Sequence, residues 1–187
     1  EVIENTFKEK CEMKYLLKSY RTTTEIMNSA SNITKYINLN VAKPVIRHGE
    51  HVKYFDFKDE NEQINIIKNL LDSYKKNEYK TIAIICKNED EAILINNKLK
   101  KDNIDIKNIT DSDTVYDGGI CTITSYLAKG LEFDGAIVAD ASEAVYDSDK
   151  NIDMKLLYVA MTRPLHELNV LYNDKITHPL QSEAVAS

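Results

Sequence analysis

Short apolar runs spaced along the chain constrain its fold more than any other feature of the sequence. The run at residues 81–86 is apolar at nearly every position, instead of at every second position. A strand of this kind is buried on both faces, which is typical of the centre of a parallel sheet. We expect further strands in the runs at residues 14–17, 52–57, 104–109, 120–124, 135–139 and 166–172.

Helix-like segments separate these runs. Apolar residues recur every three or four positions after Asp59 and again after Asn88, which predicts helices that each bury one face. Earlier in the chain, Thr22 and Glu25 have the spacing of a capping box, so we expect a helix to open at Thr22. The last helix is expected at residues 153–162. This alternation predicts an α/β fold with a mostly parallel sheet flanked by helices.

Length and composition suggest the boundaries of the domain. The chain has 187 residues, enough for one domain with its own core. We place that domain at residues 14–173, with 1–13 as a connector from an upstream domain and 174–187 as a frayed C-terminal tail. The acidic residues 142–153 are expected to form a surface loop. Because the chain does not begin with Met, we interpret it as part of a longer protein.

Charge, cysteines and hydropathy set bounds on the function. The formal net charge is −6, which argues against a domain that binds nucleic acid by broad electrostatics alone. The 3 cysteines lie far apart and lack the spacing of a zinc site, so we expect free thiols in a reducing, cytoplasmic setting. No apolar run approaches the roughly 20 residues that span a bilayer. The first residues are also too polar for a signal peptide.

A polar stretch before the strand at residues 135–139 is the strongest candidate for chemistry. Gly130 permits a tight turn or a close approach of the backbone, and Lys129 and Glu132 stand on either side of it. If the segment is extended, Glu132 points away from its apolar neighbours. A carboxylate placed in this way can accept hydrogen bonds from a ribose hydroxyl. The alternative is an exposed loop glutamate without a ligand.

Two arginines lie at the ends of predicted helices. Arg163 ends a helix and is followed by Pro164, which forces Arg163 out of helical geometry. Tyr20 and Arg21 precede a helix start, where unpaired N–H groups attract anions and an aromatic face offers a surface for a base. Arginine binds phosphate through a planar fork of donors. The alternatives are a solvated Arg21 and an Arg163 that only caps its helix.

The sequence lacks one part that a complete nucleotide site requires. It contains no Gly-x-x-x-x-Gly-Lys-Ser/Thr motif, so it has no P-loop to cradle a triphosphate. Asp140 follows an apolar run as a magnesium-binding residue does, but Ala141 stands after it instead of Glu, and we interpret Asp140 as a strand-end residue. Arginines without a P-loop are typical of one half of an ATP site shared by two domains.

Three stretches, in this order, resemble motifs IV, V and VI of superfamily-one, UvrD-like helicases. They lie at residues 20–32, 120–134 and 156–164. The resemblance implies a second RecA-like domain whose partner, an N-terminal RecA-like domain, carries the P-loop and the acids that hold Mg²⁺. It implies that ATP binds between the two domains. DNA is the partner that such helicases act on.

The resemblance also implies roles for individual residues. At the nucleotide, Arg21 and Arg163 would reach the γ-phosphate, Tyr20 would stack on the adenine, and Glu132 would bond the ribose. The residues in the same nucleotide-facing turn as Glu132 are Lys129 and Gly130. At the nucleic acid, the residues that would touch the backbone are Thr124 and Ser125.

Departures from the motifs point to a subgroup. The large domain that UvrD carries before motif V is absent, and Tyr126 stands where motif V usually has a histidine. Together with Ile-Arg-His-Gly-Glu at residues 46–50, these features resemble the helicase IV and HelD group. HelD-type members are ATPases that remodel or release RNA polymerase. Tyr126 either stacks on a base or packs against the sheet.

These observations lead to two hypotheses of different kinds. The first is the C-terminal motor domain of a helicase-like ATPase, inactive in isolation, with DNA and RNA polymerase as candidate partners and no contact with a membrane. The second is a non-catalytic RecA-like module that binds RNA polymerase or a repair complex. A P-loop and an Asp-Glu pair upstream of Glu1 would favour the first.

Overall fold

The computed structural model describes residues 18–19, 22–39, 43–44, 47–112 and 116–186. The predictions made for residues 1–17, for Tyr20 and for Arg21 therefore fall outside the described residues. The elements are β1 (Lys18–Ser19), α2 (Thr24–Tyr36), β2 (Lys43–Pro44), β3 (Lys53–Phe57), α3 (Glu60–Lys76), β4 (Thr81–Cys86), α4 (Glu89–Lys101), β5 (Ile106–Asn108), β6 (Gly119–Thr124), β7 (Phe133–Val138), α5 (Asn151–Met161), β8 (Pro164–Asn173), η1 (His178–Leu180) and α6 (Gln181–Ala186).

A six-stranded parallel sheet forms the centre of the domain and confirms the predicted α/β fold. The strand order is β3-β8-β7-β4-β6-β5, and each neighbouring pair is parallel. β4, the continuously apolar run, lies between β7 and β6 and is buried from Ile82 to Cys86. β1 and β2 form a separate two-stranded parallel sheet.

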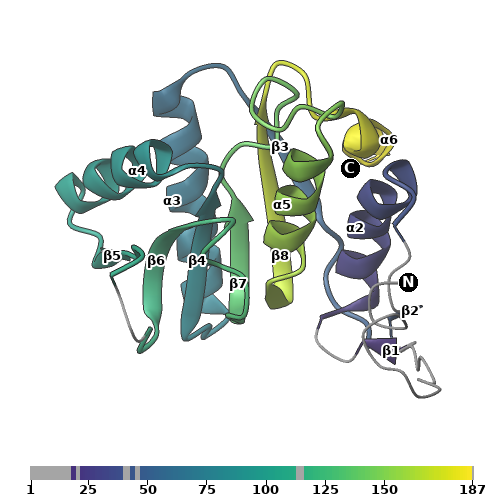
Figure 1. Ribbon diagram of the computed structural model, residues 1–187. Coiled ribbons are helices and arrows are strands. Elements are labelled where there is room, and N and C mark those ends of the chain that lie inside the picture. Colours follow the sequence, from purple (N-terminus) through teal and green to yellow (C-terminus); the bar gives the residue numbers. More distant parts are fainter. Residues whose placement is uncertain (1–17, 20–21, 40–42, 45–46, 113–115, 187) are drawn as a thin grey trace, which may run out of the picture.

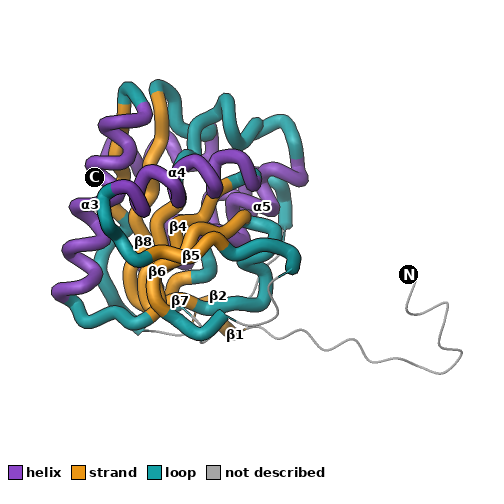
Figure 2. The backbone as a smooth tube through the Cα atoms, turned by 90° about the vertical axis from the view of Figure 1, so that its left-hand side faces the viewer, coloured by secondary structure: helices purple, strands orange, loops and turns teal. Residues whose placement is uncertain are grey.

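Helices cover both faces of the sheet and define two cores. α2 and α5 pack on one face, and α3 and α4 pack on the other (Figure 1). In the view turned by 90°, α3 and α5 lie on opposite sides of the strands (Figure 2). Successive residues of β4 alternate between the two cores, with Ala83 in the α2–α5 core and Ile84 in the α3–α4 core.

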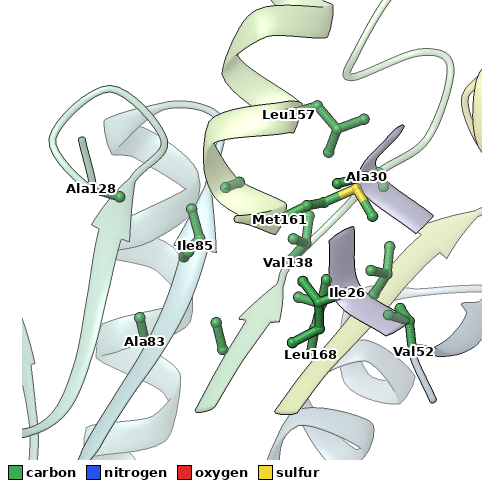
Figure 3. Close-up of a cluster of buried hydrophobic side chains, with 14 of the residues drawn as sticks. Ile26, Ala30, Val52, Ala83, Ile85, Ala128, Val138, Leu157, Met161 and Leu168 are labelled. Carbon is green, nitrogen blue, oxygen red and sulfur yellow. The ribbon is translucent and has the colours of Figure 1, made fainter. Parts of the chain in front are cut away.

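The core between the sheet and helices α2 and α5 supports the amino ends of β7 and β8. Ile26 of α2 and Met161 of α5 approach Leu168 of β8 there (Figure 3). Ile26 and Met161 have no exposed surface. Burying an aliphatic side chain of this size contributes about 1.5–3 kcal/mol, so this layer fixes how α2 and α5 lie on β7 and β8.

Helix starts follow the predicted caps, with one correction. The Asp59 carboxylate accepts the N–H groups of Asn61 and Glu62, and the Asn88 side chain accepts the Glu91 N–H, as expected for helix N-caps. The prediction that Thr22 caps α2 is wrong by one residue. Thr23 is the cap, since its hydroxyl accepts the Ile26 N–H at 3.3 Å.

The C-terminal residues correct the expectation of a frayed tail. Residues 174–186 continue into η1 and α6, and Leu180 is completely buried. The side chain of Asn32 in α2 donates to Glu183 in α6 at 3.0 Å, which ties this end of the chain to α2. The apolar residues Pro179 and Leu180 are buried in this packing, and this explains why the segment is ordered.

The acidic stretch at residues 142–153 also differs from a simple surface loop. Ser142 and Tyr146 are buried, and Tyr146 has no exposed surface. Its acidic members serve as local acceptors, because the Glu143 carboxylate accepts the Ser148 N–H and the His178 N–H, both at 2.8 Å. Within the described part of the chain, no helix combines the length and the apolar character that crossing a membrane requires.

Candidate functional site

The amino ends of β7 and β8 bring two of the predicted motifs together. Phe133 pairs with Pro164 in the ladder between these strands, and the Phe133 N–H donates to the Arg163 carbonyl at 3.2 Å. Glu132 directly precedes Phe133 in the sequence, and Arg163 directly precedes Pro164. The pairing of Phe133 with Pro164 therefore brings Glu132 and Arg163 close together. The folded sheet thus joins residues that are distant in the sequence, as the hypothesis of a common nucleotide site requires.

Arg163 lies at the C-terminus of α5 and is only 8% exposed. Its Nε donates to the Val159 carbonyl at 3.0 Å, and its Nη2 donates to the Thr162 hydroxyl at 3.3 Å. A cation at this position interacts favourably with the carbonyl end of the helix. In this conformation the guanidinium caps the C-terminus of α5.

The turn between β6 and β7 presents the other predicted nucleotide residues. Gly130 has φ +96°, a left-handed conformation that favours glycine, and a Cβ built there would meet nothing within 4 Å. Lys129 and Glu132 are both exposed. The turn therefore leaves an ammonium and a carboxylate accessible, next to the rung that joins β7 to β8.

The start of α2 lies close to the same end of the sheet. Thr22 is 2% exposed, and its hydroxyl has no hydrogen-bond partner among the described residues. Thr24 donates its N–H to the Arg47 carbonyl at 2.8 Å, so the segment at residues 47–50 runs beside the helix start. Residues 20–32 contain the stretch that resembles motif IV, and the structure places its described part beside β8 through this segment.

The segment at residues 47–50 packs between α2 and β8. A Cβ on Gly49 would lie 2.5 Å from Cγ2 of Thr23 and 3.3 Å from the carbonyl oxygen of His166, so a close approach of the backbone requires glycine here. The Gly49 N–H donates to the Glu25 carboxylate at 2.9 Å. Arg47 Nη2 lies 2.7 Å from Nδ1 of His166. Sequence reasoning missed these contacts, although the glycine at position 49 is a signal for close packing.

Asp134 anchors the amino end of β7 to β4. Its carboxylate accepts the Lys80 N–H at 2.7 Å and the Thr81 N–H at 2.9 Å, and its own N–H donates to the Thr81 hydroxyl at 2.8 Å. Partial burial alone would raise the pKa of Asp134, but these backbone hydrogen bonds lower it below the ordinary value. Asp134 is therefore a fixed negative charge beside His166, whose Nε2 lies 3.9 Å away.

The predicted nucleic-acid residues lie at the opposite end of the sheet, where β6 ends. Thr124 accepts the Leu127 N–H at 3.3 Å and so supports the turn. Ser125 has no exposed surface; its hydroxyl donates to the Cys86 carbonyl at 3.1 Å and lies 2.6 Å from the Tyr146 hydroxyl. The structure thus gives the Ser125 side chain a supporting role, and the contact of Thr124 and Ser125 with nucleic acid stays a prediction.

Tyr126 projects from this turn and is 70% exposed. The alternative that it packs against the sheet is therefore wrong. It borders a hollow of about 390 Å³ between the N-terminus of α4, the segment after β5 and the β6 turn. The lining residues are Glu89, Ala92, Ile109, Thr110, Asp111, Ser112, Thr124, Tyr126 and Leu127. An exposed aromatic ring beside a hollow is suited to stacking on a base.

The carboxyl ends of β4 and β7 are closed by charges and an aromatic ring. Lys87, the residue after β4, bonds the Asp153 carboxylate at 2.7 Å and the Val145 carbonyl, and its ammonium lies 5.4 Å from the ring centre of Tyr146. Burial and the charge of Asp140 raise the pKa of Glu91 to about 7, against the effect of a hydrogen bond from the Lys87 N–H. Asp140 is bonded to Ser142 and is a strand-end residue, as predicted.

A metal site is not formed by the described residues. No group of three or more His, Cys, Asp or Glu side chains in that part of the chain is arranged to hold an ion. Cys86 and Cys121 are buried free thiols.

Family models match nearly the whole domain. A model described as UvrD-like helicase C-terminal domain matches residues 15–117, and a second model with the same description matches residues 119–171. The first alone covers more than half of the chain. The chain therefore belongs to the UvrD-like helicase C-terminal domain family.

Solved structures support the same family and fold. The C-terminal domain of a possible DNA helicase from Lactobacillus plantarum WCFS1 is 25% identical, with a TM-score of 0.73 over 87% of this chain and 92% of that chain. S. cerevisiae Dbp5 bound to RNA and ADP BeF3 is 15% identical, with a TM-score of 0.53 over 81% of this chain and 45% of that chain.

The isolated C-terminal domain of the DEAD-box protein Dbp5 is similar as well, with 15% identity and a TM-score of 0.50 over 72% of this chain and 83% of that chain. The likeness to Dbp5 concerns the fold, and it shows that the sheet and its helices match the RecA-like C-terminal domains of helicases. No protein with a curated description matches the chain significantly.

Proposed function

We propose that this chain is the C-terminal motor domain of a DNA helicase-like ATPase and forms one wall of an ATP site. An N-terminal RecA-like domain, which this sequence does not contain, supplies the P-loop and the Mg²⁺ ligands. The observation that carries the proposal is the rung between Phe133 and Arg163, because it holds the motif V turn next to the motif VI arginine. The family and the missing P-loop support the same conclusion.

In this proposal the amino ends of β7 and β8 face the nucleotide. Arg163 leaves the carbonyls of α5 when the domains close and donates to the γ-phosphate, where a guanidinium stabilises charge that develops during transfer. Arg21 approaches the same phosphate and Tyr20 stacks on the adenine. Glu132 bonds the ribose, while Lys129 and Gly130 shape the turn that carries it.

The turn after β6 serves the nucleic acid. Thr124 and Tyr126 lie at the carboxyl end of the strand, and Tyr126 has the exposure that stacking on a base needs. Ser125 holds this turn through the Cys86 carbonyl and Tyr146. Closure of the ATP site at one end of β6–β8 then moves the turn at the other end, which couples hydrolysis to movement along DNA.

Activity measurements test the shared site. The isolated chain should have no ATPase activity, and turnover by the pure domain that disappears on Arg163→Ala would sink the proposal. In the full-length protein, Arg163→Ala should lower the rate of hydrolysis by about 10³–10⁵-fold, the range ascribed to arginine fingers, with nucleotide binding largely retained. Arg163→Lys is the matched control, and it should recover little because it lacks the planar fork.

The physiological substrate separates two forms of the proposal. We infer membership of the HelD group from residues 46–50 and from Tyr126, and this favours remodelling of RNA polymerase over unwinding of a duplex. A strand-displacement assay and an assay for release of RNA polymerase from DNA distinguish the two. If the full-length protein contains no P-loop, the rival proposal of a non-catalytic module stands instead.

A further inference from the structure

One network of side chains links the three predicted nucleotide regions. The network consists of Glu25, Asp134, His166 and the segment at residues 47–49. In the sequence, Glu25 follows Arg21, Asp134 follows Glu132 and His166 follows Arg163, each within four residues. Glu25 accepts the Gly49 N–H, Arg47 bonds His166, and His166 faces Asp134. The segment at residues 47–49 therefore connects the start of α2 with the amino ends of β7 and β8.

The imidazole of His166 is held on three sides. Arginine donates hydrogen bonds and never accepts them, so Nδ1 of His166 must accept the bond from Arg47 at 2.7 Å. Nε2 of the same ring faces the Asp134 carboxylate at 3.9 Å. The ring of Tyr79 stacks on it with 5.8 Å between centroids and an interplanar angle of 17°. These contacts hold the imidazole of His166 in one orientation, and the imidazole in turn orients the guanidinium of Arg47.

Arg47 has no compensating negative charge among the residues that the structure describes. Arg47 bonds a ring nitrogen of His166, although Glu25 lies nearby and is bonded by His48 and Gly49. Arg47 is exposed, and a guanidinium has five N–H donors. Most of its donors are therefore available to an anion.

We propose that Arg47 is a further polyphosphate-binding residue and that His166 is its positioning residue. The inference rests on the proposed function, because it assumes that a nucleoside triphosphate docks at the amino ends of β7 and β8. One N–H of Arg47 stays bonded to His166, and the other N–H groups of the guanidinium donate to phosphate oxygens. A fixed, planar guanidinium can make such paired hydrogen bonds, whereas the ammonium of a lysine cannot.

The role of the Arg47 side chain can be tested without unfolding the domain, because the contact of this residue with α2 is made by its backbone. Its carbonyl, and not its side chain, accepts the Thr24 N–H that ties the segment to α2. Side-chain variants keep that bond. Thermal unfolding of each variant checks this, and Arg47→Gln, which preserves the length of the side chain, decides the question if Arg47→Ala does not fold.

The experiment compares nucleotide binding and turnover in the full-length protein, P-loop domain included. Arg47→Ala should raise the Kd for a non-hydrolysable ATP analogue about tenfold, the loss expected for one charge-assisted hydrogen bond. The Kd for AMP should not change, because AMP lacks the β- and γ-phosphates. Arg47→Lys should recover only part of the affinity, and KM should change more than kcat.

Two further variants test the positioning by His166. His166→Ala should weaken binding of the ATP analogue in the same direction as Arg47→Ala but less, and His166→Asn should restore part of it because its side chain can place an acceptor near the position of Nδ1. His51→Ala is the matched control. It removes an exposed histidine outside the segment at residues 47–49, and it should leave the Kd unchanged.

Arg163→Ala distinguishes failure of this inference from failure of the proposed function. If Arg163→Ala abolishes turnover while Arg47→Ala and Arg47→Gln bind the ATP analogue as the wild type does, Arg47 is not a nucleotide residue and the proposed function stands. Unchanged turnover in Arg163→Ala overturns the proposed function itself. If Arg47→Ala weakens the binding of the ATP analogue and of AMP equally, Arg47 does not contact the polyphosphate. The substitution then disturbs the amino ends of β7 and β8 in general.

Discussion

The two ends of the parallel sheet hold their charges in opposite ways. At the carboxyl ends of β4 and β7, Lys87 is neutralised by Asp153, and Tyr146 fills the space between the strands and α5. At the amino ends, Arg47 bonds His166 and has no carboxylate partner among the described residues, and Arg163 donates to a carbonyl and a hydroxyl. At the first end a lysine is paired with a carboxylate, whereas at the second the described ion pairs leave the Arg47 charge unpaired.

This difference bears on where a ligand can bind. In open α/β sheets, ligands usually bind outside the carboxyl ends of the strands. Over β4 and β7 this position is occupied by the residues of the protein itself, since Tyr146 has no exposed surface and Ser125 is bonded to it. A nucleotide site at the amino ends, shared with a second domain, is consistent with this closure.

The largest effect is expected at the filled end. Tyr146→Ala should lower the free energy of unfolding by about 3–5 kcal/mol, because it removes a fully buried aromatic ring and leaves a cavity. Tyr146→Phe is the control and should cost about 1 kcal/mol, since Ser125 keeps its bond to the Cys86 carbonyl. Chemical denaturation measures both values. Equal losses in the two variants would show that the ring does not fill this end of the sheet.

A smaller effect is expected from the close approach at the other end. Gly49→Ala places a methyl group 2.5 Å from Cγ2 of Thr23 and should cost about 1–3 kcal/mol through overpacking. Adding Thr23→Ser removes Cγ2 but keeps the hydroxyl that caps α2, so the double variant should regain part of the loss. Absence of any rescue in a thermal unfolding series would place the strain elsewhere.

Glu91 should make the folded state lose stability as the pH rises from acid to neutral. Its pKa is raised to about 7 in the folded state, so the unfolded chain releases this proton first as the pH rises. The folded state therefore loses stability between the unfolded pKa, about 4.3, and pH 7. Glu91→Gln should be more stable than the wild type by about 1–3 kcal/mol at pH 8 and equal to it below pH 4. A constant difference across this range would contradict the raised pKa.

Asp134 should give the amino end the opposite and smaller dependence. Its pKa is lowered in the folded state, so its contribution is present above the unfolded pKa and is lost as the pH falls through the folded pKa. Asp134→Asn should cost about 1 kcal/mol at pH 7, and the cost should shrink towards pH 2. Denaturation at both pH values measures it, and a cost that grows in acid would exclude this role of the carboxylate.

The sequence was sufficient for the framework of the fold because its signals are local. The apolar run at residues 81–86 predicts the central strand, and two helices start where the sequence places them, near Asp59 and Asn88. The sequence predicts that α2 opens at Thr22, whereas Thr23 is the cap, because neighbouring threonines offer the same hydroxyl and only the backbone geometry selects between them.

The rest depends on contacts between distant residues, which the pattern of one segment does not contain. Tyr146 lies in an acidic stretch, and its burial depends on Ser125 from another loop. The C-terminal helix α6 is ordered through Asn32 of α2. Arg47 was noticed only within a short resemblance, and its place beside His166 follows from the packing of Gly49 against Thr23. Tyr20 and Arg21 remain predictions.

The hydrogen bond from the Phe133 N–H to the Arg163 carbonyl also allows the integrity of the site to be followed at one backbone amide. The Phe133 amide hydrogen is buried in the first hydrogen bond between β7 and β8, so it exchanges with solvent deuterium only when this end of the sheet opens. Its protection factor reports the free energy of that opening. Hydrogen exchange at Phe133, with and without nucleotide and the partner domain, therefore reads out the integrity of the site independently of catalysis.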